Sequence, residues 1–161
     1  MWGPQIEKYA SYVHELSTKT GEICGKAIHE MADIVTGKIR QNLEKAYTIP
    51  DVMGIVLWKN GNMTRMTDSE KKGLLNSLGI APMEIEDGYM NVKIGFDGYN
   101  DIKTEQYPQG QPNVLIARAV ESGSSVRYKQ PFVRPAVNAA REEALKACER
   151  VIDREIKKIM K

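Results

Sequence analysis

The chain has few of the residues that build most catalytic and metal sites. Its 161 residues include only two histidines and two cysteines. His14 and His29 do not have the four-residue separation that places two histidine ligands on one face of a helix. Neither Cys24 nor Cys148 has a second cysteine or a histidine at metal-ligand spacing. We therefore expect no metal and no cofactor, and we interpret both cysteines as free, buried thiols.

The sequence also lacks the signals of nucleotide binding and of acid–base chemistry. It contains no Gly-x-x-x-x-Gly-Lys motif, and Gly95 and Gly98 do not complete a phosphate-binding loop, so we interpret them as turn residues. Carboxylates between residues 84 and 101 could supply a catalytic pair, but the pattern places them on a solvent face or in a loop. Because nothing orients a nucleophile or a metal beside them, we expect no catalytic residues and no enzyme.

Long apolar runs are missing as well. A membrane-spanning helix needs about 20 apolar residues, and no segment approaches that length. The first residues, Met1-Trp-Gly-Pro-Gln, lack the basic stretch and apolar core of a secretion signal, so we expect a protein that is made and used without secretion. With 42% hydrophobic and 27% charged residues, the composition is typical of a globular protein, and we expect one domain over residues 1–161.

The net charge of +2 conceals an uneven distribution of charge. Residues 134–161 contain eight Lys or Arg against five Asp or Glu, which leaves +3, whereas residues 84–105 contain six acidic residues against two basic ones. These segments are either solvated faces or complementary surfaces that dock head to tail between identical copies. The basic segment could also bind nucleic-acid phosphates, but its five interleaved carboxylates favour a solvated or intersubunit helix.

Apolar spacing predicts helices towards both ends of the chain. Residues 4–15 are expected to form a short helix that the following Ser-Thr-Lys-Thr-Gly run breaks. A stronger apolar stripe predicts a second helix over residues 22–47, ended by Pro50. The last helix should begin at Pro135, with apolar residues along one side and charged residues along the other.

Turn and capping signals predict a hairpin and a short helix after the second long helix. Asn60-Gly61 suits a two-residue turn, so residues 55–66 are expected to form a β-hairpin. The sequence Thr67-Asp-Ser-Glu70 has capping-box spacing. It predicts a helix over residues 68–78 that ends at Gly79.

A second hairpin is indicated by Asp87-Gly88. This turn pairs Glu86 with Tyr89 and Met83 with Val92, and it gathers the apolar side chains on one face. Such a face needs a helix or another sheet to cover it. The expected fold class is α+β, in which a small antiparallel sheet with hairpins packs against a long helix in the N-terminal half and a long C-terminal helix.

The periodic spacing of apolar residues disappears between residues 97 and 113. A loop this long in a compact domain is usually functional or disordered. Its Pro- and Gly-rich part contains Tyr107 and Gln109, which we consider candidates for contacts with another protein. Residues 113–121 then suggest a short helix capped by Asn113, with a strand as the alternative.

The most specific segment is Gln130-Pro131-Phe132-Val133-Arg134-Pro135-Ala136, which follows the sequence Glu121-Ser-Gly123-Ser-Ser. Two prolines fix φ and disfavour helix before the second of them. We therefore expect residues 130–135, called the strap below, to be stiff and extended and to deliver Phe132 to the core.

The order of these elements resembles that of the neck and tail-completion (head-tail joining) proteins of long-tailed bacteriophages and prophages. The features that carry the resemblance are the helix over residues 22–47, the sequence Leu74-Leu-Asn-Ser77-Leu78, the strand over residues 90–95, and the Glu-x-Gly to Pro-Phe-x-Arg-Pro-Ala strap with its terminal helix. Together they span most of the chain.

The resemblance implies a virion structural protein without catalytic activity. It implies a homo-oligomeric ring, a hexamer in the assembled neck and a possible monomer in isolation, between the head connector and tail-tube proteins. DNA would pass through the lumen without sequence recognition, and no membrane would be involved. The protein would occupy the host cytoplasm during assembly and the tail or neck of the virion afterwards. The alternative is a small nucleic-acid-binding protein that uses its basic C-terminal helix.

Interface or structural roles follow from the resemblance for a small set of residues. Phe132 is expected to anchor the strap in a core. Arg134 is expected to pair with a carboxylate, such as Glu121 of the same or a neighbouring subunit, and packing within one domain is an equal alternative. The complete set of candidates is Glu121, Gly123, Pro131, Phe132, Arg134, Pro135, Tyr107 and Gln109.

Overall fold

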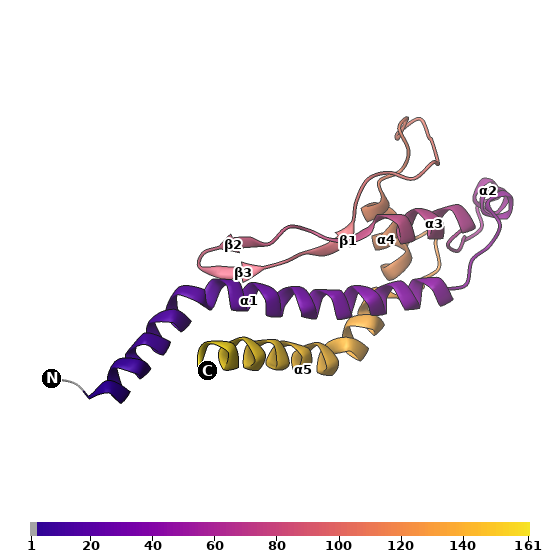
Figure 1. Ribbon diagram of the computed structural model, residues 1–161. Coiled ribbons are helices and arrows are strands. Elements are labelled where there is room, and N and C mark those ends of the chain that lie inside the picture. The colour runs from indigo at the N-terminus through magenta and orange to yellow at the C-terminus, as the bar shows by residue number, and fades with distance from the viewer. Residues whose placement is uncertain (1–2) are drawn as a thin grey trace.

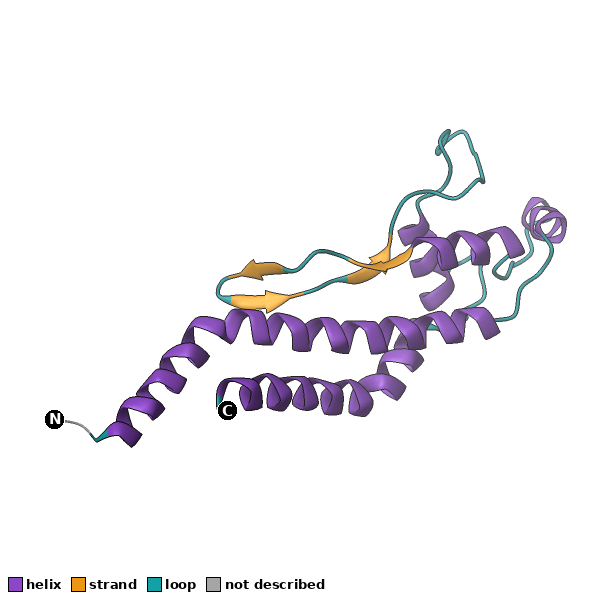
Figure 2. Cartoon of the chain, in the orientation of Figure 1, coloured by secondary structure: helices purple, strands orange, loops and turns teal. Residues whose placement is uncertain are grey.

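The computed structural model describes residues 3–161 as an elongated assembly of helices with a narrow β-ribbon along one side (Figure 1). The long helices α1 and α5 lie side by side, and the ribbon and the shorter helices lie on the opposite side of α1 (Figure 2). The expected α+β class is confirmed. The elements are α1 (Pro4–Lys45), α2 (Asp51–Lys59), α3 (Asp68–Ser77), β1 (Leu78–Ile80), β2 (Glu84–Glu86), β3 (Tyr89–Asn91), β4 (Ile94–Phe96), α4 (Asn113–Ser122) and α5 (Val133–Ile159).

The first helix is continuous, so the predicted break at residues 17–21 is wrong. The hydroxyls of Thr18 and Thr20 donate hydrogen bonds of 2.9 and 2.7 Å to carbonyls of the preceding turn, so these side chains bond within the helix. The ion pair between Lys19 and Glu15, 2.7 Å long and four residues apart, supports the same turns. Threonine back-bonding of this kind often bends a helix, and α1 changes direction in its N-terminal part (Figure 1).

Residues 4–20 of α1, called the arm below, project past the C-terminal end of α5 (Figure 1). The first buried residue of α1 is Ile23. The apolar stripe that predicted a helix here is therefore present but uncovered, and Ile6, Tyr9 and Val13 are 49%, 63% and 67% exposed.

Beyond the arm, α1 packs closely against α5. The buried positions of α5 recur every three or four residues and are mostly alanines, and those of α1 include Gly25, Ala27 and Ala32. Small side chains allow two helix axes to approach closely, because interaxial distance depends on the residues at the contact. On α5 the buried residues are Ala136, Ala140, Ala144, Ala147, Val151, Glu155 and Ile159.

Glu155 is the buried charge in this helix seam. Its carboxylate accepts a 2.7 Å bond from Lys158 of its own helix and a 3.1 Å bond from Lys26 of α1. The ammonium of Lys158, followed by that of Lys26, lowers the pKa of Glu155 from its ordinary value of 4.5 to about 2. The ion pair with Lys26 therefore joins the C-terminal part of α5 to α1.

Substitution of Glu155 by Gln should reduce the acid sensitivity of the fold. Because the pKa is lower in the folded state, the carboxylate contributes stability above its ordinary pKa of 4.5, and this is lost as pH falls towards about 2. Urea denaturation across this range should show a steeper fall in unfolding free energy for the wild type than for Glu155→Gln. Glu142→Gln, whose side chain is 83% exposed, is the control. Equal pH dependence of the wild type and Glu155→Gln would contradict this account.

The main hydrophobic core lies at the other end of the molecule, where the C-terminal half of α1 meets α3, α4 and the start of α5. Leu43, Met66, Leu74 and Val120 have less than 2% of their surface exposed. The remaining buried members are Ile39, Leu78, Ile116, Ala117, Phe132 and Ala136.

The predicted hairpin over residues 55–66 is wrong, because Asp51–Lys59 forms the helix α2. Gly61 has the positive φ of +71° that the turn prediction required, but it follows the end of a helix. Residues 64–66 find other partners: the N–H of Thr64 donates to the carbonyl of Val126 at 2.8 Å, and the carbonyl of Met66 accepts from Ile49 at 3.0 Å. These distant pairings leave the β-branched residues of α2 without a strand partner.

The predicted capping box and the helix that follows it are confirmed. The hydroxyl of Thr67 accepts from the N–H of Glu70 at 3.4 Å, and the Glu70 carboxylate accepts from the N–H of Thr67 at 2.9 Å. The helix ends at Ser77, and Gly79 lies in β1.

The turn at Asp87-Gly88 is confirmed, and the predicted register is found from Glu84 to Asn91, with Glu86 opposite Tyr89 and Ile85 opposite Met90. The predicted pair of Met83 and Val92 lies outside this ladder. The ribbon continues through β1 and β4, where Ile80 faces Ile94. Between the two ladders, residues 81–83 lie opposite residues 92–93. The β1–β2 side of the ribbon therefore contains one extra residue.

Ile85 lies opposite Met90 and therefore belongs to the predicted apolar face. That face is covered only in part, because Ile85 is 71% exposed. Met83 and Met90 do face α1, because a Cβ placed at Gly25 would lie 3.2 and 3.8 Å from their methyl carbons. A glycine in α1 thus makes room for two methionines of the ribbon.

The helical alternative for residues 113–121 is the one found. Asn113 is the first residue of α4 and not its cap, since Pro112 occupies that position. The buried Asn113 amide instead donates to the carbonyl of Asp97 at 2.9 Å, which joins the two ends of the long loop. No helix among residues 3–161 combines the length and apolar character needed to cross a membrane.

Candidate functional site

The carboxylate of Glu121, near the end of α4, closes the N-terminus of α5. Its Oε2 atom accepts from the N–H groups of Phe132 and Val133 at 2.7 and 2.8 Å, and Oε1 accepts from that of Arg134 at 2.9 Å. The first four N–H groups of a helix have no acceptor within it. Here three of them bind Glu121, and the fourth position is Pro135, which has no N–H. The negative charge also lies at the positive end of the helix dipole.

This cap explains why α5 begins earlier than predicted. The helix starts at Val133 and not at Pro135, and Phe132, with φ of −130° and ψ of −24°, is not extended, so the expectation of an extended strap is wrong from Phe132 onward. A residue before proline is disfavoured in a helix, yet Arg134 is helical because Glu121 binds three consecutive N–H groups around it. Pro135 remains in the first turn, where a missing N–H removes no intrahelical bond.

Arg134 meets Glu121 through its backbone and not through its guanidinium. The side chain is exposed and forms no ion pair within residues 3–161. The contact between these two residues is therefore made within one chain. Pairing of the guanidinium with a carboxylate of a neighbouring subunit stays a prediction.

Phe132 is 2% exposed and anchors the strap in the core. Its ring packs edge to face on Phe96 of β4, with centroids 5.8 Å apart and planes at 72°. Its carbonyl accepts a 3.2 Å bond from the side-chain amide of Asn42 in α1. The strap therefore fixes the ribbon, α1 and α5 relative to one another, while Pro131 faces solvent.

Gly123 provides the turn that leads from α4 into the strap. It ends α4 with φ of +74°, and a Cβ there would lie 3.1 Å from both the backbone N and the Cβ of Lys129. Beyond the turn, the N–H of Gln130 donates to the carbonyl of Val120 at 2.8 Å. Positive φ and close approach both favour glycine at this position.

Two residues of this region were not identified from the sequence. Arg127 forms a bidentate pair with the buried Glu70 of α3, at 2.6 and 2.9 Å. Gln130 accepts from the N–H of Met66 at 3.0 Å and donates to the carbonyl of Tyr47 at 2.9 Å, so it holds the segments on both sides of α2. The capping spacing identified Glu70, but no local pattern indicates a partner 57 residues away.

Replacing Glu121 should destabilise the fold more than its partial exposure suggests. Glu121→Ala leaves three helix N–H groups without acceptors and should lower the free energy of unfolding by about 2–4 kcal/mol. Glu121→Gln keeps one acceptor oxygen and should cost about half as much. Urea denaturation measures both, with Glu142→Ala on the exposed side of α5 as control. The cap would be unimportant if Glu121→Ala were as stable as that control.

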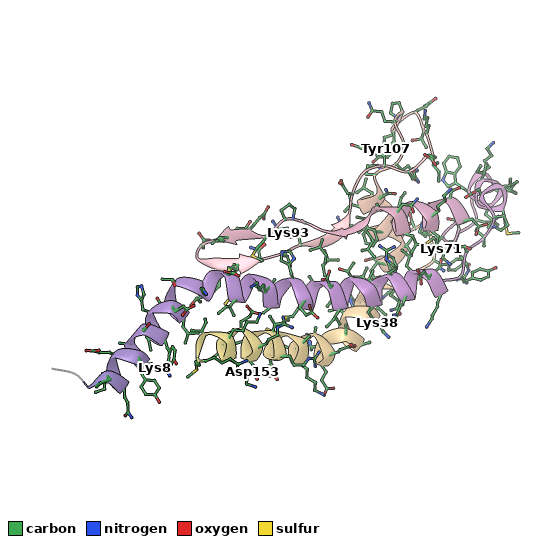
Figure 3. The ribbon with its side chains drawn as sticks, in the orientation of Figure 1. Lys8, Lys38, Lys71, Lys93, Tyr107 and Asp153 are labelled. Carbon is green, nitrogen blue, oxygen red and sulfur yellow. The ribbon has the colours of Figure 1, made fainter. Side chains whose placement is uncertain are left out.

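Tyr107 and Gln109 belong to a separate, ordered loop. The loop stands away from α1 and α5, with Tyr107 in its outer part (Figure 3). Its base is closed by Asn100, whose side-chain oxygen accepts from the N–H groups of Ile102 and Gln111 at 3.0 and 2.9 Å. The structure therefore does not bring the loop candidates together with the strap.

Gly110 is required where the loop returns to its base. It has φ of +112°, and a Cβ there would lie 1.9 Å from the carbonyl oxygen of Asn100. Gly110→Ala should open the loop, so limited proteolysis within residues 97–113 should accelerate and amide exchange at Gln111 should lose protection. Gly79→Ala is the matched control because an added Cβ there has nothing within 4 Å. Equal protease resistance of the two variants would contradict this role.

A cleft of about 940 Å³ lies between α3, the base of the ribbon and this loop. Two buried polar atoms on its lining residues, Nδ2 of Asn100 and Oδ1 of Asn113, have no hydrogen-bond partner in the described part of the chain. Gly73 leaves room over them, since a Cβ there would lie 3.1 Å from Oδ1 of Asn113. The cleft therefore offers hydrogen-bonding groups, and no group of three or more His, Cys, Asp or Glu within residues 3–161 is arranged to hold a metal.

Comparison with protein-family models, with curated proteins and with solved structures gave no match for this chain.

Proposed function

We propose that this chain is a structural protein of the phage head–tail interface that assembles as a ring between the head connector and the tail tube, without catalysis. The observation that carries the proposal is the arrangement around Glu121. The Glu-x-Gly and Pro-Phe-x-Arg-Pro-Ala segments carry the sequence resemblance, and they meet in one cap. Glu121 binds the helix start, Gly123 turns the chain, Phe132 enters the core and Pro135 needs no acceptor.

The shape of the molecule supports the same proposal. The arm, the ribbon and the loop containing Tyr107 all extend from the helical body (Figure 1). Long projections give a small chain a large surface for contacts with several neighbours at once. A structural component of an assembly uses such surfaces to bind its neighbours.

A second candidate, nucleic-acid binding, is favoured by the end of α5. Five cationic residues line one surface there with Asp153 among them: Arg150, Arg154, Lys157, Lys158 and Lys161. In a ring this surface could face the passing DNA and bind phosphates without reading sequence. As an isolated binding module, it would give the alternative function.

The test uses purified protein alone and mixed with connector and tail-tube proteins from the genome that encodes it. Light scattering after size exclusion should show a ring or a complex with those proteins, and electron microscopy should show an annular particle. Tyr107→Ala combined with Gln109→Ala should weaken the complex and leave the free energy of unfolding nearly unchanged, because these residues lie in the projecting loop. The Glu142→Gln variant is the control for surface substitution.

Two results would contradict the proposal. The first is a persistent monomer that binds none of the neighbouring proteins. The second is retention on DNA that falls steeply with rising salt in a protein that forms no such complexes, which would favour the nucleic-acid-binding alternative.

A further inference from the structure

Helix α2 exposes an apolar surface that none of the described residues 3–161 covers. Gly54 is its only buried residue, and a Cβ there would lie 2.7 Å from the Thr67 methyl carbon, so α2 rests on the body by its glycine. Its large side chains point elsewhere, and Val52 and Trp58 are 74% and 63% exposed. The exposed side chains, called the α2 patch below, are Val52, Met53, Ile55, Val56 and Trp58.

The α2 patch is large for a protein of this size. Five half-exposed apolar side chains on a nine-residue helix present on the order of 400 Å² of apolar surface, within the range of the largest patch on a typical monomer, which is often functional. Leaving this surface in water has a cost that covering it would remove. The patch therefore indicates an interface.

The arm carries a second apolar surface, of a different shape, that no other part of residues 3–161 covers. Ile6, Tyr9, Ala10 and Val13 line a shallow groove along two turns of helix. The arm and α2 lie at opposite ends of the elongated molecule (Figure 1). One chain thus presents two unlike apolar surfaces that cannot cover each other within the same copy.

We propose that the arm of one copy docks on the α2 patch of the next copy. This inference rests on the proposed ring and names the surfaces that form it. Contact between unlike surfaces at opposite ends is heterologous, and it produces a ring when the rotation between copies closes. In a closed ring, every arm and every α2 patch is covered.

Length and charge favour the arm of a second copy as the occupant. The apolar stripe over residues 6–13 and the nine-residue α2 are each about 12–14 Å long, at 1.5 Å per residue. Lys59 ends α2 and Glu7 lies on the arm, and neither forms an ion pair within residues 3–161. The neighbouring opposite charges have contacts of their own, since Asp51 binds Ser69 and Lys8 lies over the ring of Tyr12. Complementary charge would orient the arm on the patch.

The small area of this contact has a further consequence. It is about half of the roughly 800 Å² that each partner contributes to a standard stable interface. A single arm–α2 contact should therefore be weak, and ring closure or the neighbouring neck proteins would be needed to hold it. This agrees with the expectation that the protein can be a monomer when isolated.

Disulfide trapping tests which surfaces meet. In a background with Cys24→Ala and Cys148→Ala, one chain carries Tyr9→Cys and a second, differently tagged chain carries Ile55→Cys. Under mild oxidation of the mixture at the highest soluble concentration, the mixed disulfide should form about tenfold faster than either self-linked product, because docking raises the effective concentration of the two thiols. The control pairs Tyr9→Cys with Leu145→Cys, a 52% exposed position on α5, and should form little mixed product.

Every other product pattern overturns the inference. Dominant self-linking of Tyr9→Cys indicates an arm–arm dimer, and dominant self-linking of Ile55→Cys indicates paired α2 patches. Absence of any disulfide above the control means that another protein covers both surfaces. If microscopy shows a ring but the disulfides are self-linked or absent, the proposed ring stands and only the arm–α2 contact is overturned. The mixed disulfide in a protein that binds neither the connector nor the tail tube would instead overturn the proposed function.

Discussion

The carboxylate of Glu121 is the interaction on which the arrangement of the C-terminal third depends. It belongs to α4 but satisfies the first donors of α5, so the two helices are fixed to each other by three short hydrogen bonds. Without it, the start of α5 would leave N–H groups unsatisfied beside the core. Because Phe132 is one of the bonded residues, the same cap sets the depth at which its ring enters the core.

Interactions distant in sequence then build outward from this cap. Gln130 and Arg127 precede the capped residues, and they hold the connections around α2 and the N-terminus of α3 respectively. Thus Glu70 serves both the capping box of α3 and the ion pair with Arg127, whose charge compensates a carboxylate that would be costly to bury alone. The turn after α4 therefore joins elements from three parts of the chain.

The sequence predicted the elements whose signals are local, and it missed those that depend on distant partners. The capping box at Thr67 and the turn at Asp87-Gly88 are specified by a few adjacent residues, and both were predicted correctly. The Asn60-Gly61 pair suits a hairpin turn equally well, but the residues after it pair with Ile49 and residues 126–128, so the segment before it remains helical. In the candidate site, Phe132 could be predicted as a core residue from its flanking prolines. The role of Glu121 as a helix cap could not, because an acceptor eleven residues before its donor leaves no periodic pattern.

The uncovered surfaces of α2 and the arm show that the described part of the chain does not cover all of its own apolar side chains. The core around Phe132 and the alanine seam of α1 and α5 account for most buried apolar residues, and neither extends to the two ends of the molecule. An apolar helix held to the body by a glycine, and an amphipathic arm with no helix beside it, are incomplete as parts of a monomer. In the proposed arm–α2 contact, the two surfaces would pack against each other between copies. The local sequence of each segment therefore specifies a helix, whereas the use of its apolar side is decided only by what the chain assembles with.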